Sequence, residues 1–330
     1  MTRRRTVRVL SLDWDWFFSY GREGELEKLL PDPLYEECSP ECIAEEWASR
    51  YLYLTEGKTA LDLAVSQEKL FRIHSVLQIL PHAAEAFAAE SHLSLYRLLK
   101  SRYPDASFDV VQYDHHHDLC PVRDGLPDSG SWGAALLEEG RLQSLLWVGN
   151  PSSVTDCGGA PVFARYPDTV RFTVNPEEIS GPFDVLFLCR SLIWAPPHAD
   201  CEFRRLIGQI KAHTGRMHAA GGQEAQLWAP SFFASVEQAA RRQAYEAILS
   251  GYCPEEAGQH PMCTRYLPSP LRERSADSAA YEHFSSACRA FVTAERDRLM
   301  REDGMSRSAA YRKALERLIR QEECASAADS

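Results

Sequence analysis

The sequence lacks the features that mark several large classes of protein. It has no apolar run long enough to span a bilayer, and no apolar signal region follows the first residues, Met1 to Thr6. Its ten cysteines include no C-x-x-C pair and are scattered over 330 residues, which favours reduced thiols over a disulfide framework. We therefore expect a cytoplasmic protein that does not enter a membrane.

Positive charge is also in deficit. The chain carries 36 Lys and Arg residues against 47 Asp and Glu residues, a formal net charge of -11. An acidic surface repels phosphate backbones, which argues against nucleic acid as a partner. A basic peptide or a small cation suits such a field better.

Apolar runs alternate with helical patterns along the chain. This alternation predicts a three-layer α/β/α fold with a mostly parallel sheet. We expect a single domain over residues 1–330, with a helical C-terminal part from about 236 to 330. Strands are predicted over 7–18, 108–113, 142–148, 169–174, 183–189 and 224–228. Helices are predicted over 66–80, 93–101, 132–139, 201–212, 236–250, 278–300 and 306–322, and short helices and loops over 21–65.

Two acidic segments follow predicted strands. One is Asp13-Trp14-Asp15 and the other is Asp114-His115-His116-His117-Asp118. Side chains alternate along an extended chain, so Asp13 and Asp15 would share one side, as would Asp114, His116 and Asp118. Ligands of parallel sheets sit at the carboxyl ends of the strands, where both segments would meet.

The residue types in these segments predict a metal site. Carboxylates clustered without a cation repel one another, and adjacent buried histidines are costly unless they are paired or metallated. Carboxylates combined with histidine suit Mn²⁺, Fe²⁺ or Zn²⁺, whereas Mg²⁺ and Ca²⁺ prefer oxygen alone. A pair of such ions roughly 3.5–4 Å apart can activate a shared water.

The five-residue segment from Asp114 to Asp118 resembles the Asp-Ala-His-Ala-Asp signature of the ureohydrolases, the arginase and agmatinase superfamily. The stretch Leu10-Ser11-Leu12-Asp13-Trp14-Asp15 resembles the Ser-x-Asp-x-Asp signature of the same family. That second signature comes late in ordinary arginases and first here, so the order looks permuted. The resemblance covers roughly residues 7–200 and extends to an atypical branch that includes peptide arginases, which convert arginine to ornithine within ribosomally made peptides.

The resemblance implies an arginase-like fold and a centre of two Mn²⁺ ions. One ion would take His92, Asp114, Asp118 and Asp13, and the other would take His116, Asp114, Asp13 and Asp15. His92 stands just before a predicted helix, where the family has a histidine ligand; His74, inside a helical pattern, is the competitor. Asp118 is also assigned a part in catalysis. The family offers no choice between Mn²⁺ and Fe²⁺ on affinity grounds.

The chain departs from ordinary arginases around the substrate. The glutamate that holds the guanidinium is missing from residues 187–192, which leaves Asp200 and Glu202 as candidates, although acids in a first helical turn are commonly caps. The family's proton-shuttling histidine is also missing, and His198 is the candidate replacement. Trp132 and Trp194 are candidate pocket walls. His115 and His117 are candidates for orienting the metal ligands.

The leading hypothesis is hydrolysis of the arginine guanidinium in a precursor peptide, giving ornithine and urea. One alternative is amide hydrolysis of the deacetylase type, which uses one zinc ion. Another is a metal-stabilised module that binds a peptide without catalysis. The segment from Met305 to Glu323 carries both charge signs and is typical of a solvated, packed helix; its alternative role is pairing into a homo-oligomer.

Overall fold

The chain forms an α/β structure that divides into two compact units. One unit comprises residues 1–40 and 63–232, and the other comprises residues 41–62 and 233–330. The single domain predicted over residues 1–330 stays a prediction, and its helical C-terminal part falls in the second unit. The structure, a computed structural model, describes residues 5–18, 38–54, 58–78, 84–157, 160–175, 181–220, 230–252, 262–272 and 278–328.

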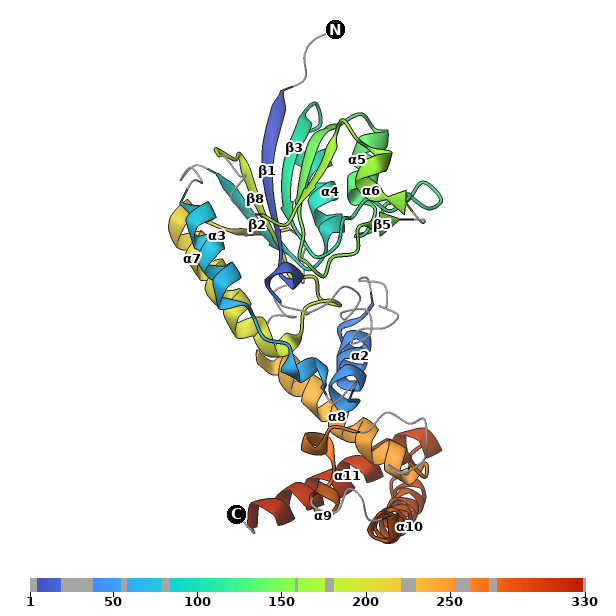
Figure 1. Cartoon of the computed structure of the whole chain (residues 1–330). Helices are drawn as coiled ribbons and strands as arrows, with labels where there is room; N and C mark the ends of the chain where they lie inside the picture. Colours follow the sequence, from blue (N-terminus) through green and yellow to red (C-terminus); the bar gives the residue numbers. More distant parts are fainter. Residues whose placement is uncertain are drawn as a thin grey trace. The chain divides into compact units, whose positions relative to one another are not determined.

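The first unit is built on a seven-stranded sheet whose neighbouring strands are all parallel (Figure 1). The strand order is β7-β4-β3-β1-β8-β2-β9. A separate antiparallel pair joins two short strands, β5 (Asp156–Cys157) and β6 (Ala160–Pro161). The strands of the sheet are β1 (Thr6–Asp13), β2 (Glu85–Ala89), β3 (Ser107–Tyr113), β4 (Leu142–Val148), β7 (Val170–Thr173), β8 (Val185–Cys189) and β9 (His218–Ala219).

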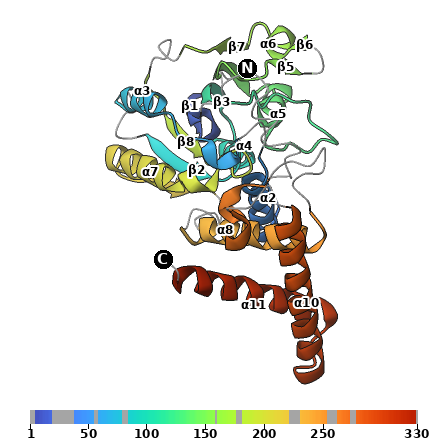
Figure 2. The same ribbon diagram turned by 60° about the horizontal axis from the view of Figure 1, so that its bottom comes forward.

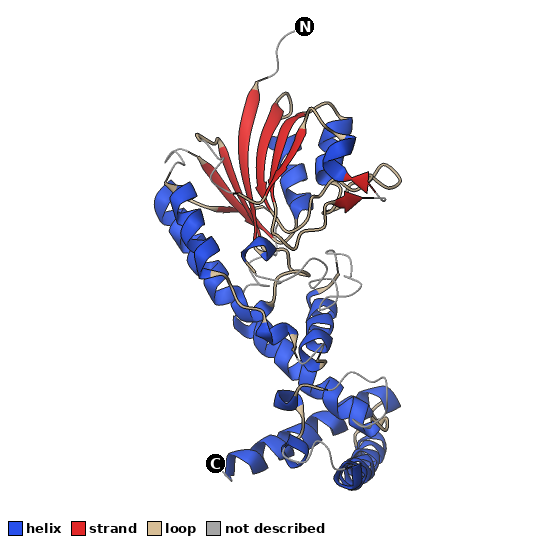
Figure 3. Cartoon of the chain, viewed as in Figure 1, coloured by secondary structure: helices blue, strands red, loops and turns tan. Residues whose placement is uncertain are grey.

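Helices cover both faces of this sheet. α4 (His92–Arg102), α5 (Trp132–Glu138) and α6 (Val162–Arg165) lie on one face, and α3 (Gln67–Leu77) and α7 (Asp200–Thr214) lie on the other (Figure 1). The turned view separates the same two groups (Figure 2). With the strands between them, shown in red in Figure 3, they make three layers. The predicted three-layer α/β/α fold with a parallel sheet is therefore confirmed.

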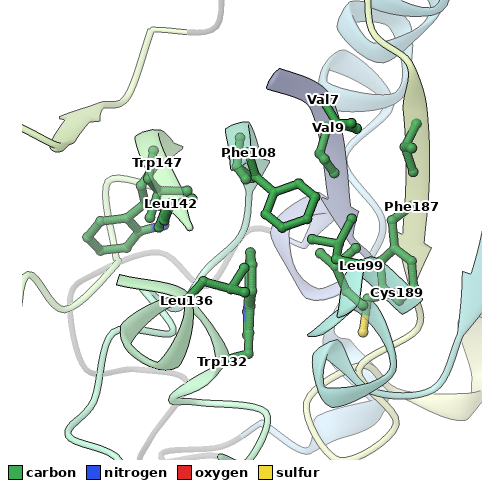
Figure 4. Packing of buried hydrophobic residues seen from close by; sticks show 14 of the residues in the cluster. Val7, Val9, Leu99, Phe108, Trp132, Leu136, Leu142, Trp147, Phe187 and Cys189 are labelled. Atoms are coloured by element: carbon green, nitrogen blue, oxygen red, sulfur yellow. The ribbon is translucent and has the colours of Figure 1, made fainter. Parts of the chain in front are cut away.

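Alternate residues of the central strands form an apolar core beneath α4 and α5. Val7 and Val9 of β1 are register partners of Phe108 and Val110 of β3, and all four side chains are buried. Trp132 of α5 packs into the same cluster (Figure 4). Burying a side chain such as valine or phenylalanine contributes about 1.5–3 kcal/mol, so this cluster fixes β1 at the centre of the sheet.

Serine caps start two of the covering helices. Ser66 Oγ accepts a hydrogen bond from Lys69 N at the start of α3, and Ser91 Oγ accepts one from Leu93 N at the start of α4. Such a cap satisfies one of the N–H groups that the first turn leaves without a partner. The cap at Ser91 makes His92 the first residue of α4, which directs that histidine to the carboxyl edge of the sheet.

The predicted strand over 7–18 is too long. β1 ends at Asp13, and Asp15–Phe17 form a short 3-10 helix, η1. The Asp13 side chain accepts a hydrogen bond from the Asp15 N–H at 3.1 Å, a local turn that competes with an extended chain. The apolar residues that follow are buried as predicted for a core, but they do not continue the strand.

β2 is absent from the sequence-based prediction. Its residues, Glu85–Ala89, read E-A-F-A-A and contain no β-branched side chain, so local propensity does not favour a strand. Pairing with β8 and β9 overrides that propensity. The strand predicted over 224–228 lies outside the described residues. The remaining predicted elements of this unit differ from the observed ones by only a few residues at their ends.

The second unit is helical and has its own apolar core. Its helices are α2 (Pro40–Leu52), α8 (Pro230–Leu249), α9 (Ser269–Arg272), α10 (Ser278–Glu302) and α11 (Arg307–Ala328). Leu299 of α10 packs with Leu315 of α11, and Arg317 of α11 pairs with Glu295 of α10. The three C-terminal helices predicted from the sequence are confirmed. Over the described ranges, no helix has the length and apolar character needed to cross a membrane.

Candidate metal centre

The two acidic segments meet at the carboxyl edge of the sheet. β1 ends at Asp13, and β3, its parallel neighbour, ends one residue before Asp114. Adjacent parallel strands leave a sheet at the same edge, which brings the two segments together. The first turn of α4 adds His92. The structure thus gathers the six predicted ligands: Asp13, Asp15, His92, Asp114, His116 and Asp118.

Four of these residues form a group that we name the His92 side. His92 Nδ1 lies 3.0 Å from Asp118 Oδ2, 3.2 Å from Asp13 Oδ2 and 3.4 Å from Asp114 Oδ2. The other ring nitrogen, Nε2, lies 2.9 Å from Ser11 Oγ. All four side chains are buried. Because Ser11 contacts Nε2, the imidazole directs Nδ1 to the three carboxylates. Metal-binding histidines are commonly oriented in this way, by a hydrogen bond to the other ring nitrogen.

The remaining ligands form the His116 side. His116 Nδ1 lies 2.9 Å from Asp15 Oδ2 and 3.8 Å from Asp114 Oδ1. Asp114 therefore offers Oδ1 to this side and Oδ2 to His92. The ligand atoms of Asp15, Asp114 and His116 lie within 4.8 Å of one another, as do those of His92, Asp114 and Asp118. Each group can hold a metal ion, and Asp114 is common to both.

Burial makes this set of carboxylates costly without a cation. Burial, reinforced by the negative charge of Asp15, raises the pKa of Asp13 well above its usual range. Burial and the charges of Asp118, Asp13 and Asp15 do the same to the pKa of Asp114. Burial acts on Asp15 too, but the hydrogen bonds and charges of His116 and His115 together outweigh it and lower the pKa of Asp15. A divalent cation would offset the repulsion, and carboxylates with imidazoles suit Mn²⁺, Fe²⁺ or Zn²⁺.

The segment after β3 is not extended, so that expectation was wrong, although the convergence it predicted is found. Asp118 has a φ of 53°, in the left-handed region, and this turn brings its carboxylate back to His92. Such a conformation costs about 1–2 kcal/mol outside glycine. Gly133 N donates to the Asp118 carbonyl at 3.1 Å, and a Cβ on Gly133 would stand only 3.1 Å from that oxygen. Glycine here permits the close approach that holds the turn.

Neutral donors orient the carboxylates. Gln112 Nε2 donates to Asp114 Oδ2 at 2.5 Å and to Asp118 Oδ2 at 3.0 Å. The indole N–H of Trp132 also donates to Asp118 Oδ2, at 2.7 Å. Trp132 is fully buried, so it positions a ligand rather than forming the pocket wall that the sequence suggested. Sequence reasoning missed Gln112, although an amide two residues before Asp114 in an apolar strand faces the same side.

The two other histidines of the segment have different surroundings. The backbone N–H of His115 donates to Asp15 Oδ1 at 3.2 Å, and burial lowers the pKa of its ring to about 3. His115 Nδ1 lies 3.4 Å from Asn150 Nδ2. His117 Nδ1 accepts a hydrogen bond from Leu119 N at 2.9 Å. The backbone of His115 therefore contacts Asp15, whereas the His117 ring contacts the next turn and lies edge-on to the ring of Trp147 at 5.8 Å.

A cavity of about 340 Å³ opens onto the metal centre. Trp194 lines it, as predicted, and its ring lies 4.3 Å from the ring of His116. The loop between β3 and α5 adds one positive and one negative side chain to the cavity lining, Arg123 and Asp128. The cavity is large enough for a side chain and is lined by both aromatic and charged groups, as ligand sites commonly are.

Asp200 does not line this cavity. It is buried, and its two carboxylate oxygens accept hydrogen bonds from Nε and Nη2 of Arg190, each at 3.0 Å. The Asp200 carboxylate, which the sequence suggested for binding the substrate guanidinium, is therefore already paired with the guanidinium of Arg190. This pairing argues against a substrate role for Asp200.

Three further candidates also lie away from the cavity lining. Glu202 accepts a hydrogen bond from the Cys201 thiol, and His198 Nε2 lies 2.8 Å from the Leu63 carbonyl. His74 is exposed on α3, so His92 is the histidine that reaches the carboxylates. Asp200 and Glu202 lie in the first turn of α7 and His198 in the 3-10 helix Pro197–Ala199 before it, and none of the three lines the cavity.

Comparisons with protein-family models, with curated proteins and with solved structures found no match to this chain. The metal centre is thus defined by its own geometry. Its chemistry must be argued from the residues described above.

Proposed function

We propose that the protein is a dinuclear metal hydrolase that converts arginine residues of a peptide to ornithine, releasing urea. One observation carries the proposal: two potential metal-binding groups share the buried Asp114, and His92, His116 and Asp118 of these groups line a cavity that admits a side chain. The residue pattern within each ligand motif, which resembles the ureohydrolase signatures although their order is permuted, supports guanidinium hydrolysis. The net charge of -11 supports a cationic substrate.

Two Mn²⁺ ions are the proposed cofactor, one held by the His92 side and one by the His116 side. When bound, such a pair supplies an activated water and stabilises the charge that develops on the substrate. Hydrolysis breaks the bond between the guanidinium carbon and the side-chain nitrogen. The water oxygen goes to the carbon, giving urea, and the nitrogen takes a proton, giving ornithine.

The residues of the chain divide the remaining tasks. Trp132 and Gln112 hold the carboxylates of Asp118 and Asp114 in place for the ions. His117 lines the cavity, and because its Nδ1 accepts the Leu119 N–H, the neutral ring carries its proton on Nε2. That N–H can hold the departing urea or the amine, a task that His198 cannot perform from its place against Leu63.

Asp128 is the proposed guanidinium partner, in place of Asp200 and Glu202. With Asp13 and Asp118 assigned to metal, Asp128 is the lining carboxylate that remains for the substrate. Replacement by asparagine removes a charged hydrogen bond worth about 1.5–3 kcal/mol, so KM should rise about 10–150-fold. Asp124→Asn, on the same loop but outside the cavity lining, is the control and should leave KM unchanged.

The decisive experiment supplies Mn²⁺-loaded protein with an arginine-containing peptide, with free arginine and with an acetyl-lysine peptide. We expect urea and a peptide of the mass that ornithine gives. Urea from free arginine alone would revise the substrate, and Arg123→Ala should then weaken that activity, because Arg123 would face the free carboxylate. Acetate without urea would identify a deacetylase instead, and no product from any substrate would refute the hydrolase.

A further inference from the structure

Cys189 is a buried thiol that the proposed function does not use. It is the last residue of β8 and the register partner of Asp13, the last residue of β1. Register partners on parallel strands point to the same face of the sheet, here the face covered by α4. Cys189 is fully buried and belongs to the apolar cluster beneath that helix, with its sulfur drawn in yellow in Figure 4.

The sulfur lies at the metal centre as well as in the core. Cys189 Sγ, a carboxylate oxygen of Asp13 and a ring nitrogen of His92 all lie within 4.8 Å of one another. Cys189 Sγ also lies 3.9 Å from Ser191 Oγ, which donates to Asp13 Oδ2 at 2.6 Å. Among the described residues, this is the one group of potential metal ligands that contains a cysteine.

We propose that Cys189 is a thiolate ligand of the ion on the His92 side. The inference rests on the two-ion centre proposed above and adds a soft ligand to one half of it. A thiolate binds Zn²⁺, Fe²⁺ and Co²⁺ in preference to the hard ions Mn²⁺ and Mg²⁺. With this thiolate, the His92 side would take a softer ion in place of one of the two Mn²⁺ ions proposed above. The His116 side, whose potential ligands are two carboxylates and an imidazole, would keep Mn²⁺.

Coordination by Cys189 also divides the work of the two ions. Protein ligands would surround the ion on the His92 side: His92, Cys189, Asp13, Asp114 and Asp118. A closed shell is typical of structural sites, whereas catalytic sites keep an open position for water or substrate. The ion beside His116 and Trp194 would have fewer protein ligands and would keep that open position, in a cavity that Asp13, His92 and Asp118 also line.

Cobalt substitution tests the ligand directly. The full-length protein is stripped of metal and titrated with Co²⁺, and near-ultraviolet absorption is followed for the sulfur-to-cobalt charge-transfer band. We expect the band in the wild-type protein and its loss in Cys189→Ser, with visible cobalt bands from the other ligands retained. Cys120→Ser is the matched control, because Cys120 lines the cavity but belongs to none of the ligand groups.

X-ray absorption of the zinc-loaded wild-type protein gives a second measurement that needs no variant to fold. A sulfur neighbour at about 2.3 Å supports the inference, and a shell of only nitrogen and oxygen at about 2.0–2.2 Å overturns it. Bound Co²⁺ without the charge-transfer band, or with a band that survives in Cys189→Ser, also overturns it. If the band behaves as expected but no urea forms, the thiolate ligand stands and the proposed hydrolase fails.

Discussion

The two halves of the metal centre share Asp114 but differ in exposure. On the His92 side the histidine side chain is 3% exposed, and its three carboxylate neighbours are at most 6% exposed. On the other side the His116 side chain is 28% exposed, and its ring lies 4.3 Å from the tilted ring of Trp194 at the cavity. The difference teaches that residues of similar ligand types can be buried in one half of the centre and partly open to a cavity in the other.

The two halves also depend on different parts of the fold. His92 is fixed by the capped start of α4, and Asp13 by the end of the central strand. Asp15 and His116 stand on the first turns beyond β1 and β3, outside the sheet. Side chains on regular elements are held more rigidly than those on connecting turns. We therefore expect substitutions on the His92 side to affect stability and those on the His116 side to affect activity.

The largest effect is expected from Asp114→Asn, which removes the shared ligand. Both ions should be lost, together with about 4 kcal/mol of stabilisation for each ion where wild-type protein is measured at a metal concentration 1,000 times Kd. Metal content and the Mn²⁺-induced rise in Tm measure this loss. Asp109→Asn is the control, since Asp109 lies on β3 and bonds Ser144 away from the centre. A normal Mn²⁺-induced rise in the Asp114 variant would contradict a shared site.

The variants His92→Ala and His116→Ala test whether the two sides differ in their effect on stability. Each variant should bind one ion fewer and lose urea production. In metal-free protein, His92→Ala should lower the free energy of unfolding by about 2–5 kcal/mol, the usual cost of truncating a large buried side chain. The partly exposed His116 should cost under about 1 kcal/mol. Denaturant unfolding in the presence of a chelator measures both, and equal losses would remove the distinction.

Trp132→Phe should weaken metal binding on the His92 side alone. It keeps a buried aromatic ring in the core but removes the N–H that holds Asp118 Oδ2. Loss of such an orienting contact typically weakens metal affinity by about 10–100-fold. Calorimetric titration should show this loss for the ion of the His92 side only. Trp47→Phe, a fully buried indole in the second unit, is the control and should leave both affinities unchanged.

The smallest effect is expected outside both halves, at Glu85 of β2. Hydrogen bonds from Arg102 lower the pKa of this carboxyl from 4.5 to about 2. A lowered pKa gives stability that is present above pH 4.5 and is lost as the pH falls toward about 2. Glu85→Gln should therefore destabilise slightly at neutral pH and flatten that acid branch of Tm against pH. An unchanged acid branch would show that the pair contributes nothing.

The sequence predicted the ligands better than it predicted their surroundings. Asp13 and Asp114 were found because each follows an apolar strand, and position at a strand end depends on local pattern. The sequence predicted Cys189 only to be a reduced thiol, because its nearness to Asp13 depends on the register of two strands far apart in the chain. The left-handed turn at Asp118 was missed for a similar reason, since Gly133, whose N–H holds it, belongs to another element.

The substrate side was the least predictable. Asp200 stands in the first turn of α7, and sequence alone could not show that Arg190, ten residues earlier, would fill its carboxylate. β2 was missed because alanine-rich residues become a strand only between two existing neighbours. In both cases a tertiary contact outweighed a local pattern.

The central place of β1 has a consequence for biosynthesis. β1 pairs with both β3 and β8, and Asp13 meets Ser191 across 178 residues of chain. A ribosome adding about 5–20 residues per second needs roughly 10–35 s to synthesise that interval. During this time an apolar strand destined for burial has no partner on its β8 edge, so it is a natural target for chaperones. If Cys189 and Asp13 bind the same ion as proposed, the ion can be acquired only late, after β8 has emerged.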